Sequence, residues 1–350
     1  MSPVKVFLVD DSAVMRTVIG RILRERFGFE VVGTGVDGRD ALQKIPAADP
    51  DVVVMDVEMP KLDGLGALRE LMATKPVPVV MLSAHTRTGS RAAIEALALG
   101  AVDFVPKPAR SSEITSIVAD LGAKIKTAAG VSPRVVLTEA PQSQDAPVVV
   151  PVPGRVPGGR TELIVIGCST GGPNALRALL PNLPADLSAA VVVVQHMPAG
   201  FTVSLAEHLN ALCPLEVRHA ADDDPIVPGR VLIAPSGKAF RLKTGPGGVR
   251  VGVAEDTTAL VPGGFRPSVN EVMIQAASIY GDRVMGVLLT GMGRDGADGM
   301  KAISLKYGYT IAQDERSSVV YGMPRAAVEN GAVRRVLPLT EIASDIVQHL

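Results

Sequence analysis

Short apolar runs alternate with amphipathic segments in the first part of the chain. The segments between the runs, such as residues 13–27 and 91–100, carry apolar residues at helical spacing, and a further helix is expected over 113–129. Strands that alternate with helices in this way are typical of βαβ units in a parallel sheet. The expected strands are residues 4–10, 29–35, 50–56, 77–84 and 101–108.

The same alternation resumes after Arg160. The apolar runs there are almost continuous, as expected for parallel strands that are covered by helices on both faces. Residues 240–254 differ, because two alternating segments flank Gly-Pro-Gly-Gly and predict an antiparallel hairpin. The expected parallel strands are residues 162–167, 189–195, 231–237 and 283–291. Both halves are therefore expected to be doubly wound, parallel-sheet α/β domains.

The composition changes between the two halves. Residues 138–159 are rich in Pro, Gly and small polar residues and have no helical period. Because prolines disfavour regular pairing, we interpret this stretch as an extended, mobile linker, in which "VVVPV" is apolar enough to dock on a neighbouring surface. We expect a first domain over 1–127, a linker over 128–159 and a second domain over 160–350.

Composition and charge narrow the classes of function. Hydrophobic residues make up 47% of the 350 residues and charged residues 20%, and the net charge of −1 argues against a general nucleic-acid binder. No apolar run reaches the ~18 residues that a membrane span needs, and no secretion signal is evident at the N-terminus. The two cysteines, Cys168 and Cys213, have no metal-site spacing and are expected to be free thiols. We expect a cytoplasmic protein without direct membrane insertion.

Polar side chains follow the expected strands of the first domain. Asp10 and Asp11 end the first strand, Asp56 the third and Ser83 the fourth, and Lys107 follows the fifth. The carboxyl ends of parallel strands share one edge of a sheet, so these groups are expected to converge. Clustered carboxylates favour Mg²⁺, and Asp56 is the best phosphoryl acceptor, with Lys107 and Ser83 stabilising the transferred oxygens. A single Asp after a strand is more often a cap or turn residue, so the joint placement carries this prediction.

The pair "DD" and the motifs "MDVEMPKLDG", "SA" and "KP" occur in that order. This pattern resembles the response-regulator receiver domain over about residues 4–126, which implies a flavodoxin-like fold and phosphorylation of Asp56 by a histidine kinase. The resemblance also places Phe104 at the family's switch-aromatic position. It implies that Mg²⁺ is held by Asp11, Asp56 and the backbone carbonyl of Glu58, with Asp10 in support.

A Gly-rich turn in "LIVIGCSTGGPNALRALL", residues 163–180, lies between an expected strand and an expected helix. Such a turn can cradle a phosphate or present a nucleophile. A dinucleotide fingerprint would need a glycine where Ser169 stands and an acidic residue at the end of the next strand, which instead ends in Gln195-His196. No G-K-[ST] follows to make a P-loop, so a dinucleotide-dependent enzyme is disfavoured.

A nucleophile at Ser169 would find partners at neighbouring strand ends. His196 is the candidate base and Asp295, beyond a third strand, the candidate orienting carboxylate. The flanking glycines, Gly291, Gly293 and Gly296, would allow close approach of the backbone and offer N–H groups to an oxyanion. Each catalytic candidate also has a simpler interpretation: Ser169 as a backbone cap, His196 as a structural histidine and Asp295 as a turn residue. Rivals are Cys168 as nucleophile, Asp298 as orienter, and His208 and His219 as bases.

The motifs "IGCSTGGPNAL", "QHMPAGFTVSLAEHLN", "IAPSG", "FRPSVN" and "LLTGMGRDGADGM" resemble the catalytic domain of the chemotaxis protein-glutamate methylesterase family, CheB, a Rossmann-like domain with an antiparallel hairpin. The resemblance places catalysis on Ser169, His196 and Asp295, and an oxyanion donor in the backbone around Met292. It implies hydrolysis of glutamate γ-methyl esters on chemoreceptors, with release of methanol and without a cofactor for the ester chemistry; some members also deamidate glutamine.

The fusion of a receiver to an esterase leads to the hypothesis that phosphorylation activates the esterase. We expect the unphosphorylated receiver to restrict access to Ser169. The alternative is a phosphorylation-controlled, non-enzymatic adaptor, against which the presence of all three catalytic candidates argues.

Overall fold

A computed structural model describes residues 2–84, 86–107, 114–131, 148–149, 160–255 and 265–350. The chain divides into two compact units, Met1–Thr138 and Glu139–Leu350. The limits of the expected linker fall mostly outside the described residues and stay a prediction. None of the helices in the described part of the chain combines the length and the apolar composition that crossing a bilayer requires.

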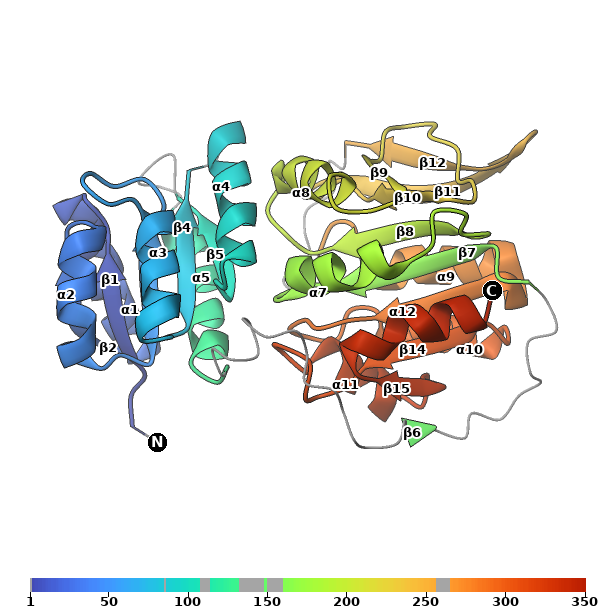
Figure 1. The fold of residues 1–350 in the computed structure, drawn as a ribbon. Coiled ribbons are helices and arrows are strands. Elements are labelled where there is room, and N and C mark those ends of the chain that lie inside the picture. The colour runs from blue at the N-terminus through green and yellow to red at the C-terminus, as the bar shows by residue number, and fades with distance from the viewer. Residues whose placement is uncertain (1, 85, 108–113, 132–147, 150–159, 256–264) are drawn as a thin grey trace. The chain divides into compact units, whose positions relative to one another are not determined.

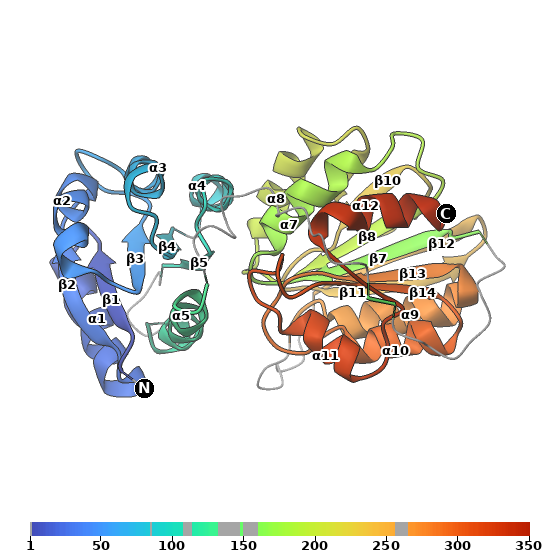
Figure 2. The ribbon, with the colours of Figure 1, turned by 60° about the horizontal axis from the view of Figure 1, so that its bottom comes forward.

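The first unit is a five-stranded parallel sheet in the order β2-β1-β3-β4-β5. Helices α1 and α5 cover one face of this sheet, and α2, α3 and α4 cover the other (Figures 1 and 2). Every residue of β3 and β4 is buried, which explains their continuous apolar runs. The elements are β1 (Lys5–Val9), α1 (Ala13–Phe27), β2 (Glu30–Gly35), α2 (Gly38–Ala48), β3 (Val52–Asp56), α3 (Gly64–Thr74), β4 (Val79–Ser83), α4 (Arg87–Ala98), β5 (Asp103–Pro106) and α5 (Ile114–Ala128).

Local signals set the limits of α1. Ser12 caps its N-terminus by accepting a hydrogen bond from the backbone N–H of Met15, and Gly28 ends it in the left-handed region at φ 67°. The N-terminal cap lies directly after the turn that follows β1, where Asp10 and Asp11 lie, and the Ser12 N–H donates to Asp10 Oδ1. The order of the sheet reverses between β1 and β3, so the ends of these two strands border the crevice where open α/β sheets bind ligands.

The second unit contains an eight-stranded sheet in the order β6-β15-β14-β13-β7-β8-β10-β9. Helices α7, α8 and α12 cover one face, and α9, α10 and α11 the other (Figure 2). The elements are β6 (Val148–Val149), β7 (Leu163–Cys168), α7 (Gly172–Leu179), β8 (Ala190–Gln195), α8 (Phe201–Asn210), β9 (Glu216–His219), β10 (Arg230–Ile233), β11 (Ala239–Gly245), β12 (Gly248–Ala254), α9 (Val269–Tyr280), β13 (Val284–Leu288), α10 (Ala297–Leu305), β14 (Tyr309–Gln313), α11 (Met323–Glu329), β15 (Arg335–Leu337) and α12 (Leu339–Gln348).

Two features of this unit bear on the sequence predictions. The expected hairpin forms as a separate two-stranded sheet, β11 with β12, tied to α9 by a hydrogen bond from the Leu242 N–H to Gln275 Oε1 (2.9 Å). Within the expected linker, β6 pairs antiparallel with β15, so the prediction that this stretch has no regular pairing was wrong at these two residues. The rest of residues 132–159 lies outside the described part of the chain.

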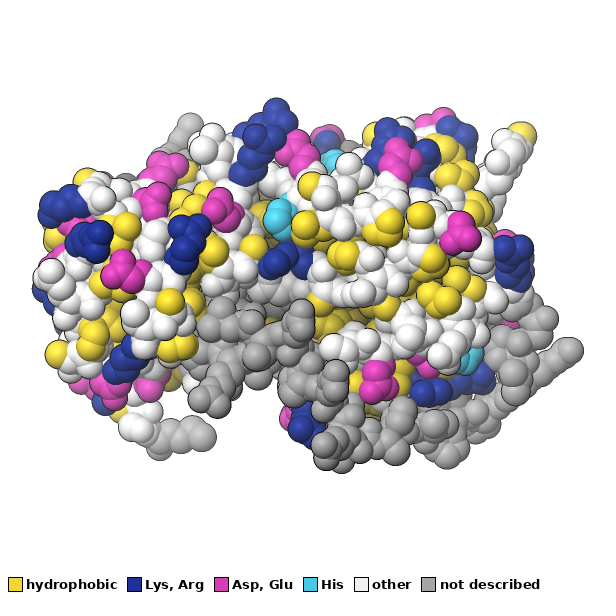
Figure 3. All heavy atoms as spheres, viewed as in Figure 1, with side chains coloured by type: hydrophobic (Ala, Val, Ile, Leu, Met, Phe, Trp, Pro, Cys, Tyr) yellow, Lys and Arg dark blue, Asp and Glu magenta, His cyan; other side chains and the backbone are white. Residues whose placement is uncertain are grey.

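The surface carries both signs of charge. On the face in Figure 3, Lys and Arg side chains are interspersed with Asp and Glu over the described surface of both units. No broad field of positive charge is visible among the described residues of this face, in line with the near-zero net charge.

Candidate active site and phosphorylation site

Ser169 is the first residue after β7, the strand at which the order of the larger sheet reverses. Its backbone N–H donates to the Thr290 carbonyl (3.0 Å), and its own carbonyl accepts from the Gly172 N–H (2.8 Å). Gly171 has φ +79°, and a Cβ on Gly172 would lie 2.0 Å from Gln195 Oε1. Both glycines are therefore required for the sharp turn that leaves Ser169 half-buried in front of α7.

His196 lies beside Ser169 because β7 and β8 pair in register. Cys168 faces Gln195 across the two strands, so Ser169 and His196 are the next residues at the same edge. The buried Gln195 side chain ties the two turns together, since its Nε2 donates to the carbonyls of Ser169 (2.9 Å) and His196 (2.7 Å). The sequence reasoning did not assign this role to Gln195, and a polar residue ending an apolar run was the available signal.

His196 Nε2 lies 2.9 Å from Asp295 Oδ2, and only 3% of the histidine side chain is exposed. An ionised carboxylate can only accept, so Nε2 carries the proton of this hydrogen bond. The other ring nitrogen, Nδ1, is buried and has no hydrogen-bond partner among the described residues, and so Ser169 Oγ does not donate to it here. Hydrogen bonds between a nucleophile and its base often form only when substrate binds.

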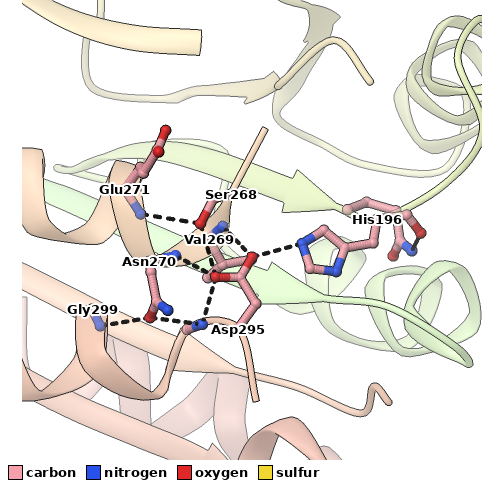
Figure 4. Close-up of polar contacts among 9 residues, drawn as sticks. His196, Ser268, Val269, Asn270, Glu271, Asp295 and Gly299 are labelled. Atoms are coloured by element: carbon pink, nitrogen blue, oxygen red, sulfur yellow. Dashed lines mark hydrogen bonds and ion pairs between the residues drawn. The ribbon is translucent and has the colours of Figure 1, made fainter. Parts of the chain in front are cut away.

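Asp295 is held at the N-terminus of α9, as Figure 4 shows. Its Oδ1 accepts from Ser268 Oγ (2.8 Å) and the Asn270 N–H (3.0 Å), and its Oδ2 accepts from the Val269 N–H (2.7 Å) as well as from His196. Burial alone would raise the pKa of Asp295, but the hydrogen bonds from His196 and from the backbone lower it below its ordinary value. The carboxylate is therefore ionised and fixed.

The residues that hold Asp295 were not predicted. Asn270 Oδ1 accepts from the N–H groups of Gly296 (2.9 Å) and Gly299 (2.8 Å), which fixes the loop carrying Asp295 against α9. Ser268 is the N-cap of α9 and accepts from the Glu271 N–H. The pattern Ser-x-x-Glu at 268–271 is a helix-start signal that could have located this capped terminus.

The side chains of three of the rival residues have other contacts. Cys168 is fully buried, its thiol donates to Gln195 Oε1 (3.0 Å), and burial raises the pKa of this thiol far above its ordinary value. Asp298 accepts from Asn330 Nδ2 (3.2 Å), and His219 Nε2 lies 3.1 Å from Thr202 Oγ1. His208 belongs to α8.

The turn after β13 packs directly on Ser169. A Cβ on Gly291 would lie 2.8 Å from Ser169 Cβ and 2.3 Å from Met323 Sδ, so this close approach requires glycine. The next residue, Met292, exposes 37% of its surface although it is apolar. The candidate oxyanion donor is thus one residue away from the point of contact with Ser169.

In the first unit, Asp10, Asp11 and Asp56 bring one carboxylate oxygen each to within 4.8 Å of one another. Lys107 Nζ lies 2.6 Å from Asp56 Oδ2 and 2.9 Å from Asp10 Oδ2. The second contact is an ion pair that lacks hydrogen-bond alignment, so Asp10 Oδ2 is buried without a hydrogen-bond donor among the described residues. Burial raises the pKa of Asp56 to about 6, although the hydrogen bond from Lys107 opposes this.

These residues fit a hard divalent cation. A buried carboxylate oxygen without a hydrogen bond, next to two further carboxylates, matches the oxygen-rich ligand set of Mg²⁺. A cation would also favour the ionised form of Asp56 against the desolvation that raises its pKa.

Two predicted residues of the first unit have other contacts. Ser83 Oγ donates to the Gly89 carbonyl (2.7 Å) and is fully buried, so the structure does not bring this hydroxyl into a hydrogen bond with Asp56. Phe104 is buried, and its carbonyl accepts from Lys124 Nζ (2.7 Å).

Comparisons with known proteins agree with this two-unit architecture. The family described as CheB methylesterase matches residues 164–346, and the response regulator receiver domain matches residues 6–119. The protein-glutamate methylesterase/protein-glutamine glutaminase of Symbiobacterium thermophilum is 46% identical over 360 residues, covering 99% of this chain and 97% of that protein. The protein-glutamate methylesterase/protein-glutamine glutaminase 1 of Carboxydothermus hydrogenoformans is 45% identical over 350 residues, with both chains covered completely.

Among solved structures, the CheB methylesterase catalytic domain of Thermotoga maritima is 38% identical, with a TM-score of 0.52, and the match covers 55% of this chain and 100% of that one. The two relatives are similar to this chain over both units, and the Thermotoga maritima catalytic domain is similar to its second unit. The chain belongs to the CheB methylesterase family, with a response regulator receiver domain in front of its methylesterase domain.

Proposed function

We propose that this chain is a phosphorylation-activated hydrolase that removes methyl esters from glutamate side chains of chemoreceptors and releases methanol. The observation that carries the proposal is the His196–Asp295 pair, which is held at the N-terminus of α9 beside the turn that presents Ser169. Relatives named protein-glutamate methylesterase/protein-glutamine glutaminase support ester and amide substrates of this class. A cytoplasmic location stays a prediction.

In the proposed reaction, Ser169 Oγ attacks the ester carbonyl and His196 Nδ1 takes its proton. The same nitrogen then returns a proton to methoxide, which leaves as methanol, and water repeats the sequence to free the glutamate. Asp295 holds the tautomer with the proton on Nε2 and stabilises the imidazolium without accepting the proton. The unpaired, buried Nδ1 supports its role as the base.

The backbone around Met292 is proposed to stabilise the oxyanion. We expect Gly291→Ala to lower kcat about 10- to 100-fold, because its Cβ would push the turn away from Ser169 and misplace the donor. Steady-state methanol release measures this. Gly245→Ala, at a glycine with open space around it and no positive φ, is the matched control and should leave kcat unchanged. An unchanged kcat in Gly291→Ala would remove the turn from the mechanism.

The receiver is proposed to control this chemistry through Asp56. Asp11, Asp56 and the Glu58 carbonyl would hold Mg²⁺ with Asp10 in support, and the cation would neutralise charge on the incoming phosphoryl group. Lys107 is already aligned on Asp56, whereas Ser83 would have to exchange its bond to Gly89 before it could contact a phosphoryl oxygen. A histidine kinase is the proposed phosphodonor, and Phe104 the switch residue.

The function is tested by the release of labelled methanol from receptor membranes that carry methylated glutamates. We expect turnover by the full chain and stimulation by a small phosphodonor with Mg²⁺. Asp56→Asn should keep the basal rate and lose the stimulation, as should removal of Mg²⁺ with a chelator. No methanol above the membrane-only background would favour the non-enzymatic adaptor. Ammonia release from receptor glutamines, measured in parallel, tests the amidase activity.

A further inference from the structure

The ring of Phe265 lies flat against the imidazole of His196. The ring centroids are 4.0 Å apart and the planes are inclined by only 8°. The chain holds the buried imidazole at Cβ, and Asp295 holds it by a hydrogen bond at Nε2. These two attachments do not by themselves prevent rotation about the axis that joins them, and such a rotation would swing Nδ1. A flat contact on the face of the ring opposes that rotation.

Phe265 is not placed as a core residue. It exposes 42% of its surface, whereas Phe7, Phe104 and Phe201 expose 2% or less. Burial of apolar surface is the usual reason for an aromatic side chain at a given position, and it accounts for only part of this one. The contact with His196 therefore needs its own explanation.

The same short segment also holds Asp295. Residues 265–270, here called the clasp segment, begin with Phe265 on the imidazole and continue to Ser268, Val269 and Asn270, which all donate to the Asp295 carboxylate. One stretch of chain thus holds the Asp295 carboxylate and covers one face of the His196 imidazole, and so it fixes the position of one relative to the other. Ser169 belongs to a different strand end, so the clasp segment sets how the pair is aimed toward it.

We propose that Phe265 is a positioning residue that fixes the plane of the His196 imidazole so that Nδ1 is aimed at Ser169. The inference rests on the proposed function, because it assigns Phe265 a role in that reaction. Phe265 acts through His196, so its loss is expected to lower the rate of proton transfer rather than the binding of the receptor.

Two variants of the full chain test the proposal. Phe265→Leu keeps an apolar side chain but removes the flat ring, and we expect kcat to fall about 10- to 100-fold with KM changed less than about twofold. Phe265→Tyr keeps the flat ring. Because the native ring is partly exposed, the added tyrosine hydroxyl can reach water, and kcat should stay within about threefold of wild type. Tyr307→Leu is the matched control. It removes an exposed ring at the opposite edge of the sheet, before β14, and should change neither constant.

A spectroscopic measurement separates positioning from general stability. A stacked aromatic ring shifts the NMR signals of the His196 ring protons upfield, and this shift should persist in Phe265→Tyr and disappear in Phe265→Leu. Thermal unfolding of each variant shows whether it folds. If Phe265→Leu does not fold, Phe265→Met replaces it, and the same results are expected. If the wild-type chain is active and the leucine or methionine variant keeps both kcat and KM at wild-type values, the proposal is overturned. An inactive wild-type chain would instead overturn the proposed function.

Discussion

Ser169→Ala is expected to lower the kcat of methanol release by about 10⁴-fold or more, because removing the nucleophile of a serine triad leaves only the oxyanion donors and binding. The side chain is half-buried at the end of β7, and the backbone bonds of Ser169 to Thr290 and Gly172 do not involve its hydroxyl. We therefore expect the free energy of unfolding to change by less than about 1 kcal/mol. Phosphorylation of Asp56 should proceed at the wild-type rate.

Cys168→Ala is the matched control for this prediction, since it removes one heavy atom from the adjacent residue. The Cys168 thiol is fully buried and bonded to Gln195, and burial keeps it protonated by raising its pKa. Its loss should leave kcat within about threefold of wild type. Turnover that survives in Ser169→Ala and disappears in Cys168→Ala would replace the serine mechanism with a thiol mechanism.

The apolar pattern predicted the strands that position the site, because β7, β8 and β13 are buried along their full length. Ser169 and His196 lie at the same edge of the sheet because the strands before them are neighbours in the sheet as well as along the chain. Strand β14 escaped prediction although all of its residues are buried. Two of these, Thr310 and Gln313, are polar and find partners in Arg334 and Thr290, so they weaken the apolar signal without weakening the strand.

Contacts between distant segments could not be predicted. Asp295 and Asp298 lie in the same Gly-rich turn, and no periodicity distinguishes them. The choice is made by α9, whose N-terminal N–H groups face Asp295, more than twenty positions away along the chain. Phe265 likewise contacts His196, and Gln195 contacts Ser169, across a large separation in sequence. Ser83 was placed correctly at a strand end, but its rotamer depends on the Gly89 carbonyl at the start of α4.

Asp295→Asn is expected to lower kcat by about 10³- to 10⁴-fold, because the amide favours the wrong tautomer of the base. Both carboxylate oxygens accept from donors: Oδ1 from Ser268 and Asn270, and Oδ2 from Val269 and His196. An NH₂ group in either position faces at least one backbone N–H. If it takes the place of Oδ2, His196 must accept at Nε2 and carry its proton on Nδ1, where the base is needed.

The same substitution is expected to destabilise the fold by about 1–3 kcal/mol, since it leaves a buried donor without an acceptor. The folded-state pKa of Asp295 is lowered, so the ionised carboxylate stabilises the fold above its unfolded pKa of about 3.9, and this contribution is lost as the pH falls through the folded value. Urea unfolding at pH 7 should therefore show the difference between wild type and variant, and unfolding near pH 3 should show it reduced.

Asp298→Asn tests whether the effect belongs to Asp295 alone. Asp298 lies in the first turn of α10, is exposed and accepts only from Asn330 among the contacts of its side chain that the structure describes. Its replacement should leave kcat within about twofold and the free energy of unfolding within about 0.5 kcal/mol of wild type. A loss of kcat in Asp298→Asn equal to that in Asp295→Asn would mean that the orienting carboxylate is shared or misassigned, because the clasp segment provides donors to only one of the two.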